Sequence, residues 1–142
     1  MTGTIELLDW ISTNNPLIVR PWRDERVEAI GYGPRSEYVE TFWLTVLGPS
    51  CVLVLRRFGW WLELQPDGFE VPIEDLARTV GLGTGAGRRA PIVRTLARLV
   101  EFNLALIDGP HYAIRVALPP LVPRQVARLP RFLIDHHSTL QT

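Results

Sequence analysis

The chain lacks several features that particular classes of protein require. It contains a single cysteine, Cys51, among 142 residues, so an internal disulfide is impossible and the fold does not depend on an oxidising compartment. The longest apolar run, residues 51–55, is far shorter than the roughly 20 residues that a membrane-spanning helix needs. The N-terminus has neither the basic region nor the long apolar region of a signal peptide. We therefore expect a cytoplasmic protein without a membrane partner.

Lysine is also absent, and all fifteen basic residues are arginine. This bias is typical of GC-rich coding sequences, although arginine also suits bidentate contacts with phosphate and guanine. Fifteen acidic residues balance the arginines, and a net charge of zero argues against a nucleic-acid-binding protein. The charges are segregated, however: residues 1–71 carry ten acids and six arginines, whereas residues 72–142 carry five acids and nine arginines. Any contact with nucleic acid is therefore expected in the second half.

The composition, with 46% apolar and 21% charged residues, is that of one ordinary globular domain. Prolines and glycines interrupt every hydrophobic period in residues 1–35. We interpret this segment as a partly irregular arm with one helix around Ile5–Ile11 and a short strand from Leu17. The rest of the chain, 36–142, is expected to form the single domain.

Two apolar helices are predicted after this arm. Ser36 is a good N-cap for the first helix, and Gly48 ends it. Pro49 then occupies the first position of a second helix that runs to about Leu64. The second helix carries more apolar surface than one packing face requires. It is therefore expected either to lie in the centre of the core or to pair with a second copy of the chain or another protein. The residues that would form such an interface are Val54, Trp60 and Trp61.

The region 73–117 has the most specific pattern in the chain. A short amphipathic helix begins at Ile73, and a glycine-rich segment separates it from a longer predicted helix over 88–102. Two β-rich runs then flank a tight Asp-Gly turn, which predicts a hairpin over 104–117. A C-terminal helix is predicted over about 123–137.

This order of elements resembles the winged helix-turn-helix family, with the helix-turn-helix over about 73–102 and the wing over about 104–117. The resemblance implies a fold that is mainly α with a small β-hairpin (α+β), with extra N-terminal helices and a C-terminal helix. The glycines lengthen the turn beyond the three or four residues usual in that family. The whole chain also resembles small uncharacterised actinobacterial proteins that share SEYVETFW (36–43) and LPPL (118–121), a likeness that implies no activity.

The winged-helix resemblance implies a transcriptional regulator that reads double-stranded DNA with the helix 88–102 and the wing. With the apolar stripe turned inward, basic and polar side chains of this region would face the groove and the phosphates. The candidate DNA contacts are Arg88, Arg89, Arg94, Thr95, Arg98, His111 and Arg115. The alternative for each arginine is a solvated surface position paired with a nearby acid.

Other chemistry finds less support in the sequence. The glycines between 81 and 87 follow a helix rather than a strand and are not followed by Gly-Lys, so they do not form a nucleotide-binding loop. The adjacent His136 and His137 point apart and have no third metal ligand at suitable spacing. Cys51 lies in the most apolar run, as a buried hydrophobic residue does. No catalytic arrangement stands out, so we expect no enzymatic activity, cofactor or metal.

Two further hypotheses remain open beside the DNA-binding regulator. Winged helices also act as protein-interaction modules, because a fold does not determine a function. The acidic first half and its aromatic helices favour such a scaffold without DNA binding. A regulator that responds to a small molecule would place the ligand among Trp43, Trp60 and Trp61.

Overall fold

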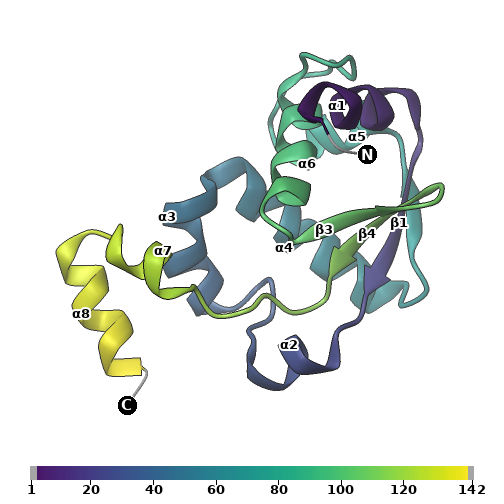
Figure 1. The fold of residues 1–142 in the computed structure, drawn as a ribbon. Coiled ribbons are helices and arrows are strands. Elements are labelled where there is room, and N and C mark those ends of the chain that lie inside the picture. Colours follow the sequence, from purple (N-terminus) through teal and green to yellow (C-terminus); the bar gives the residue numbers. More distant parts are fainter. Residues whose placement is uncertain (1–2, 141–142) are drawn as a thin grey trace.

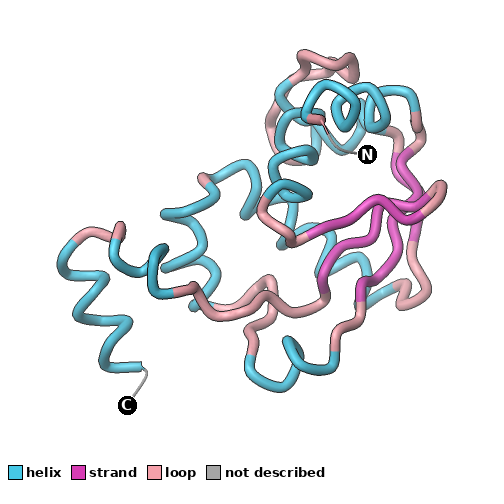
Figure 2. Tube along the Cα trace, viewed as in Figure 1, coloured by secondary structure: helices cyan, strands magenta, loops and turns pink. Residues whose placement is uncertain are grey.

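The computed structural model describes residues 3–140, in which one small sheet lies at one side of the molecule and helices make up most of the rest (Figures 1 and 2). The elements are α1 (Thr4–Thr13), β1 (Leu17–Trp22), α2 (Glu25–Ile30), the π-helical turn η1 (Val39–Trp43), α3 (Leu44–Leu47), α4 (Pro49–Leu64), β2 (Phe69–Val71), α5 (Ile73–Thr79), α6 (Pro91–Glu101), β3 (Ala105–Asp108), β4 (His111–Arg115), α7 (Pro123–Ala127) and α8 (Arg131–Leu140). The predicted class, mainly α with a small β part, is confirmed at that level.

The sheet has four strands in the order β2-β1-β4-β3. The strands β3 and β4 form the predicted antiparallel hairpin, with Asp108 opposite His111. Its turn requires a left-handed backbone at Gly109 (φ +60°), which glycine adopts without steric cost. The hairpin expected from the Asp-Gly pair is therefore confirmed.

The strand β1 occupies the middle of this sheet. It pairs antiparallel with β2 and parallel with β4, so that Val19 lies opposite Phe69 on one side and Tyr112 on the other. Leu17 and Val19 are completely buried. The N-terminal residues, which we expected as a partly irregular arm, thus share one core with the rest of the chain, and residue 35 does not separate two packing units.

Local signals set the ends of the helices around residue 48. The Ser36 hydroxyl accepts a hydrogen bond from the Val39 N–H at 3.3 Å, as expected of an N-cap. Gly48 adopts φ +87°, where α3 ends, and Pro49 is the first residue of α4. These predictions are confirmed, although the helix after Ser36 has a π-helical turn at Val39–Trp43 that periodicity did not indicate.

The start of α5 depends on the N-terminal segment. Pro72 precedes the helix and gives it no side-chain cap. Asn15 supplies the cap instead: its Oδ1 accepts from the Ile73 N–H at 2.9 Å, and its Nδ2 donates to Glu74 Oε1 at 2.6 Å. This hydrogen bond lowers the pKa of Glu74. The arm therefore orients the first helix of the expected helix-turn-helix.

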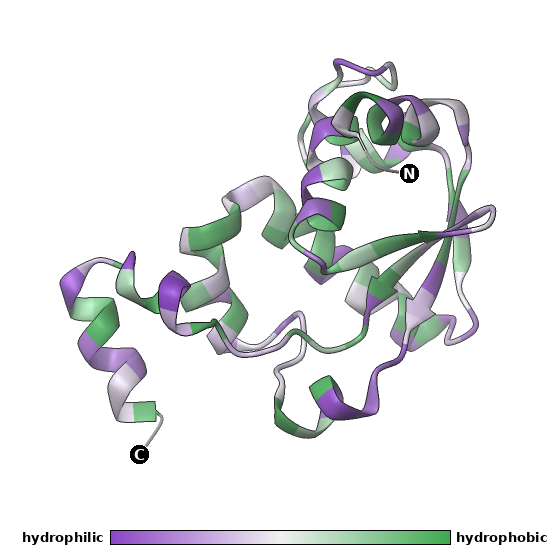
Figure 3. Ribbon diagram, in the orientation of Figure 1, coloured by the Kyte–Doolittle hydropathy of each residue, from purple (hydrophilic) through white to green (hydrophobic). Residues whose placement is uncertain are grey.

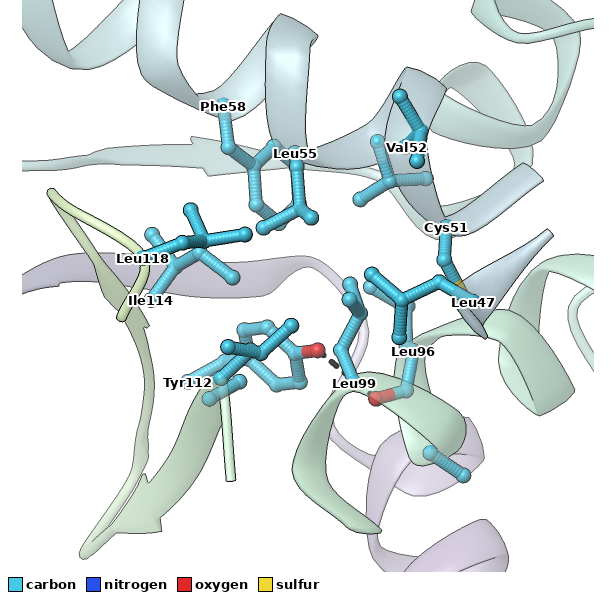
Figure 4. Packing of buried hydrophobic residues seen from close by; sticks show 14 of the residues in the cluster. Leu47, Cys51, Val52, Leu55, Phe58, Leu96, Leu99, Tyr112, Ile114 and Leu118 are labelled. Atoms are coloured by element: carbon cyan, nitrogen blue, oxygen red, sulfur yellow. Dashed lines mark hydrogen bonds between the residues drawn. The ribbon is translucent and has the colours of Figure 1, made fainter. Parts of the chain in front are cut away.

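Side chains from α4, α6 and the sheet form the centre of the core (Figure 4). The Tyr112 hydroxyl of β4 donates to the Leu96 carbonyl of α6 at 2.8 Å, which joins the hairpin to that helix. Cys51 is buried beside them, and burial raises the pKa of its thiol to about 11. The thiol stays protonated at neutral pH, so the buried hydrophobic role expected for Cys51 is confirmed.

The C-terminal region forms two helices instead of the one expected over 123–137. Pro130 cannot donate a backbone hydrogen bond, and it separates α7 from α8. His137 of α8 is buried, and its Nε2 lies 2.7 Å from the Tyr38 hydroxyl, which also accepts from the Leu121 N–H at 2.9 Å. Trp43 Nε1 donates to the Pro119 carbonyl at 2.9 Å. The segments 36–43 and 118–121 therefore hold each other in place.

Candidate nucleic-acid interface

One narrow stripe of α6 faces solvent. All but one of its other positions are buried against α1, α4, α5 and the sheet, and the buried ones are Ile92, Val93, Thr95, Leu96, Ala97 and Leu99; Val100 is half-buried. The exposed positions recur every three or four residues along one side and are Pro91, Arg94, Arg98 and Glu101. Arg94 and Arg98 thus lie one turn apart on the same face, as their spacing predicts.

The helix α1 borders this stripe. A groove of about 380 Å³ lies between the two helices, with Thr4 and Leu8 on one side and Arg94, Arg98 and Glu101 on the other. The N-terminal segment therefore narrows the surface that α6 presents, a feature that the resemblance to winged helices did not include. A duplex that reaches Arg94 would meet α1 at the same time.

The Arg98 guanidinium is held in place by the end of α3. Its Nε donates to the Leu47 carbonyl at 3.0 Å, and its Nη2 donates to the Val46 carbonyl at 3.1 Å. Its carbon lies 4.9 Å from the centroid of the Phe102 ring. A guanidinium has five N–H donors, so three remain for another partner.

Arg88 and Arg89 lie in the loop before α6, because the helix begins at Pro91 and not at residue 88 as expected. Arg88 Nη1 forms an exposed ion pair with Asp9 of α1 at 3.4 Å. Arg89 is exposed and has no ion pair within residues 3–140. Of these two arginines, only Arg89 has its charge uncompensated.

Thr95 does not lie on the solvent side, and that expectation is wrong. Its side chain is 6% exposed because it faces α4. The hydroxyl donates to the Pro91 carbonyl at 2.8 Å and lies 3.1 Å from Ser50 Oγ. These contacts occupy the hydroxyl within the core.

Arg115, expected to contact DNA from the wing, is also buried and only 7% exposed. Its Nε donates to the Asn103 carbonyl at 2.8 Å, its Nη1 pairs with Asp24 Oδ2 at 3.2 Å, and its guanidinium lies 3.7 Å from the Trp22 ring centroid. The hydrogen bond from Arg115 lowers the pKa of Asp24. Arg115 therefore fastens the sheet to the start of α2. His111, the other expected wing contact, is half-buried at the start of β4.

The three residues of α4 that were expected at an interface differ from one another in how exposed they are. Val54 is completely buried, so the prediction that it contacts a partner is wrong. Trp61 is half-buried, with its ring 5.4 Å from that of Phe69. Trp60 is 42% exposed, and Leu53 and Leu64 beside it on the helix are 42% and 65% exposed. The exposed apolar face of α4 is therefore formed by Leu53, Trp60 and Leu64.

Two arginines that were not among the expected contacts, Arg124 of α7 and Arg128 just after it, also lie near α6. Together with Arg98 they line a pocket of about 330 Å³ between α3, α6 and α7. Figure 3 shows a hydrophilic part of α7 near the hydrophobic ribbon of α3. The signal was present as two arginines four residues apart, but the sequence alone does not place α7 beside α6.

Within residues 3–140 there is no group of three or more His, Cys, Asp or Glu side chains that could hold a metal ion. In the same part of the chain, every helix is too short or too polar to cross a membrane. Searches among models of known protein families, curated proteins and solved structures found no match to the chain.

Proposed function

We propose that the chain is a DNA-binding regulator that directs the exposed stripe of α6 toward duplex DNA. The observation that carries this proposal is the position of Arg94 and Arg98 on one exposed face, one turn apart. An α-helix fits the major groove, and arginine makes bidentate contacts with guanine or phosphate. Arg89, exposed in the loop before the helix, adds a contact to the phosphate backbone.

In this proposed complex the hairpin makes fewer contacts with DNA than a wing usually does. Arg115 is enclosed by Asp24 and Trp22, so it makes no contact with the duplex. His111 at the start of β4 is the remaining expected contact of the hairpin. The affinity for DNA then depends on α6 and on the arginines beside it, and without a basic excess over the whole chain the non-specific affinity is modest.

The test is a fluorescence-anisotropy titration of a labelled duplex at several salt concentrations. Wild-type protein binds with an affinity that falls as salt rises, and Arg94→Ala weakens binding and lowers the slope by about one for each lost phosphate contact. Arg131→Ala is the matched control, because Arg131 is 87% exposed and its one ion pair within residues 3–140 is with Asp135 of α8. Absence of salt-sensitive binding by the wild-type protein overturns the proposal.

A second candidate function is a protein-interaction module, and the exposed face of α4 favours it. Leu53, Trp60 and Leu64 present apolar surface to solvent on one helix. Light scattering at increasing concentration measures whether a homodimer forms through this face and whether Trp60→Ser abolishes it. A stable partner that depends on Trp60, together with no affinity for duplex DNA, would favour this function over the regulator.

A further inference from the structure

A cluster of three arginines lies beside the exposed stripe of α6. Arg98 of α6, Arg124 of α7 and Arg128 just after α7 line one pocket of about 330 Å³, together with Thr45 and Gln125. Among the described residues, the lining of this pocket includes no acidic side chain. The pocket is therefore a concave surface with concentrated positive charge.

Five arginines elsewhere in the chain differ from these three, because each has an acidic partner. The pairs within residues 3–140 are Arg23–Glu28, Arg35–Glu63, Arg88–Asp9, Arg115–Asp24 and Arg131–Asp135. Within residues 3–140, no ion pair includes Arg98, Arg124 or Arg128. Positive charges that share a pocket repel one another, and a bound anion would relieve this repulsion.

One of the three guanidinium groups is already oriented. The Val46 and Leu47 carbonyls and the Phe102 ring fix Arg98, so a ligand that binds it loses little side-chain entropy. Arg124 and Arg128 stand four residues apart and line the same pocket. Gln125 Oε1 accepts from the Val122 N–H at 3.0 Å, which leaves the amide NH₂ group as a further donor.

We propose that this pocket binds a phosphate group. Planar guanidinium forks match the oxygen atoms of phosphate and bind them with charge-assisted, bidentate hydrogen bonds. The Thr45 hydroxyl and the Gln125 amide add uncharged donors. Arg98 lines both this pocket and the groove beside Arg94. If the chain binds DNA as proposed above, the phosphate in this pocket therefore belongs to the backbone of the duplex. A free phosphate ester carries the same chemistry.

The experiment uses two probes, inorganic phosphate and a short duplex, with the double variant Arg124→Gln/Arg128→Gln. Arg26→Gln/Arg131→Gln is the matched control, because it also removes two positive charges, but from exposed positions outside the pocket. Inorganic phosphate at millimolar concentration shifts the ¹H–¹⁵N resonance of Arg98 Nε in wild-type protein and control, and not in the pocket variant. In the pocket variant, the duplex affinity falls about tenfold at 0.1 M salt and the salt slope falls by about one.

The outcomes separate the pocket from the proposed DNA function. A phosphate response together with weakened duplex binding supports both proposals. A phosphate response in a protein that binds no duplex supports the pocket, with a free phosphate ester as its ligand, and overturns the DNA function. If phosphate leaves Arg98 unaffected and the pocket variant binds the duplex as tightly as the control, the pocket is overturned while the DNA function stands. Unchanged circular dichroism spectra establish that the variants are folded.

Discussion

The two ends of the chain are attached to the same core in different ways. At the N-terminal end, β1 lies between two strands of the sheet, and Asn15 caps α5. At the C-terminal end, α8 lies at the far end of the molecule from the sheet (Figure 1), and the buried His137 joins it to Tyr38. The first end is therefore part of the sheet, whereas the second packs against the outside of the core through Leu129, Leu133 and Ile134 and adds a few polar contacts.

The largest loss of stability is expected from a charge placed in the middle of the sheet. Val19 is completely buried between β2 and β4, and Val19→Asp places a carboxylate there without a partner. We expect destabilisation by more than about 4 kcal/mol and a largely unfolded chain, because an unpaired buried charge is very costly. Circular dichroism and urea unfolding measure this. A folded variant with near wild-type stability would contradict the central position of β1.

At the other end, Tyr38→Phe removes one hydroxyl that joins two segments to η1. The substitution leaves the buried Leu121 N–H and His137 Nε2 without their partner, and we expect a loss of about 1–2 kcal/mol in the free energy of unfolding. Tyr32→Phe is the matched control, because that ring stacks on Tyr38 and its hydroxyl has no hydrogen bond within residues 3–140. Urea unfolding followed by tryptophan fluorescence compares the two, and equal losses would contradict the role of the Tyr38 hydroxyl.

Removal of the Asn15 cap from α5 is expected to cause a smaller loss of stability. Asn15→Ala removes the acceptor of the Ile73 N–H and the donor to Glu74, and we expect a loss of about 1 kcal/mol, as for other helix caps. Glu74→Ala keeps the Asn15 acceptor for the Ile73 N–H and removes only the hydrogen bond between Asn15 and Glu74, so it separates the two hydrogen bonds. Thermal unfolding measures both variants. Wild-type stability of Asn15→Ala would show that α5 does not need the N-terminal segment.

The smallest expected effect is a pH dependence that arises at the C-terminal end. Burial lowers the pKa of His137 below its usual value of 6.5, and the neighbouring His136 adds to this shift. The unfolded chain therefore binds a proton at a higher pH than the folded chain, so stability is highest above pH 6.5 and falls as the pH decreases toward the lower folded-state pKa.

Urea unfolding between pH 7.5 and 5.5 measures this decrease. In His137→Gln the group that titrates is absent, while an amide oxygen is available to the Tyr38 hydroxyl, so the decrease is smaller than in the wild type. Carboxylates with lowered pKa values, such as Glu28 and Glu74, act at lower pH and do not interfere. A wild-type protein whose stability is constant over this range would contradict the prediction.

Short-range signals predicted much of the local structure. Ser36, Gly48 and Pro49 placed the helix ends correctly because caps and backbone restrictions act over a few residues. The Asp-Gly pair predicted the hairpin for the same reason. The boundary of α6 was predicted three residues early, although Pro91 is a typical first helical residue.

Contacts between residues far apart in the sequence were not predicted. Nothing near Leu17 indicates that β1 lies between β2 and β4, because strand order depends on residues far along the chain. Arg115 has the same chemistry as an exposed arginine, and its partner Asp24 is 91 residues away. Thr95 and Val54 were misplaced because a helical period indicates the apolar face, but not which of its edges other helices cover.

In the candidate site, too, the short-range features were predicted and the long-range contacts were not. The four-residue spacing of Arg94 and Arg98 correctly placed both on one exposed face. The cluster of Arg98 with Arg124 and Arg128 depends on how α7 packs beside α6, which no spacing expresses. The groove between α1 and α6 escaped prediction for the same reason.

The central position of β1 also has a consequence for the order of folding. A chain that emerges from the ribosome exposes β1 early, but its parallel partner β4 ends only at Arg115. Until then β1 pairs with β2 at most, and its second edge offers unpaired backbone groups to other chains. Contacts between such distant parts of a sequence slow folding, because the entropy of closing a long loop is lost first. Fragments that end before β4 therefore retain an open strand edge, which favours association with other chains.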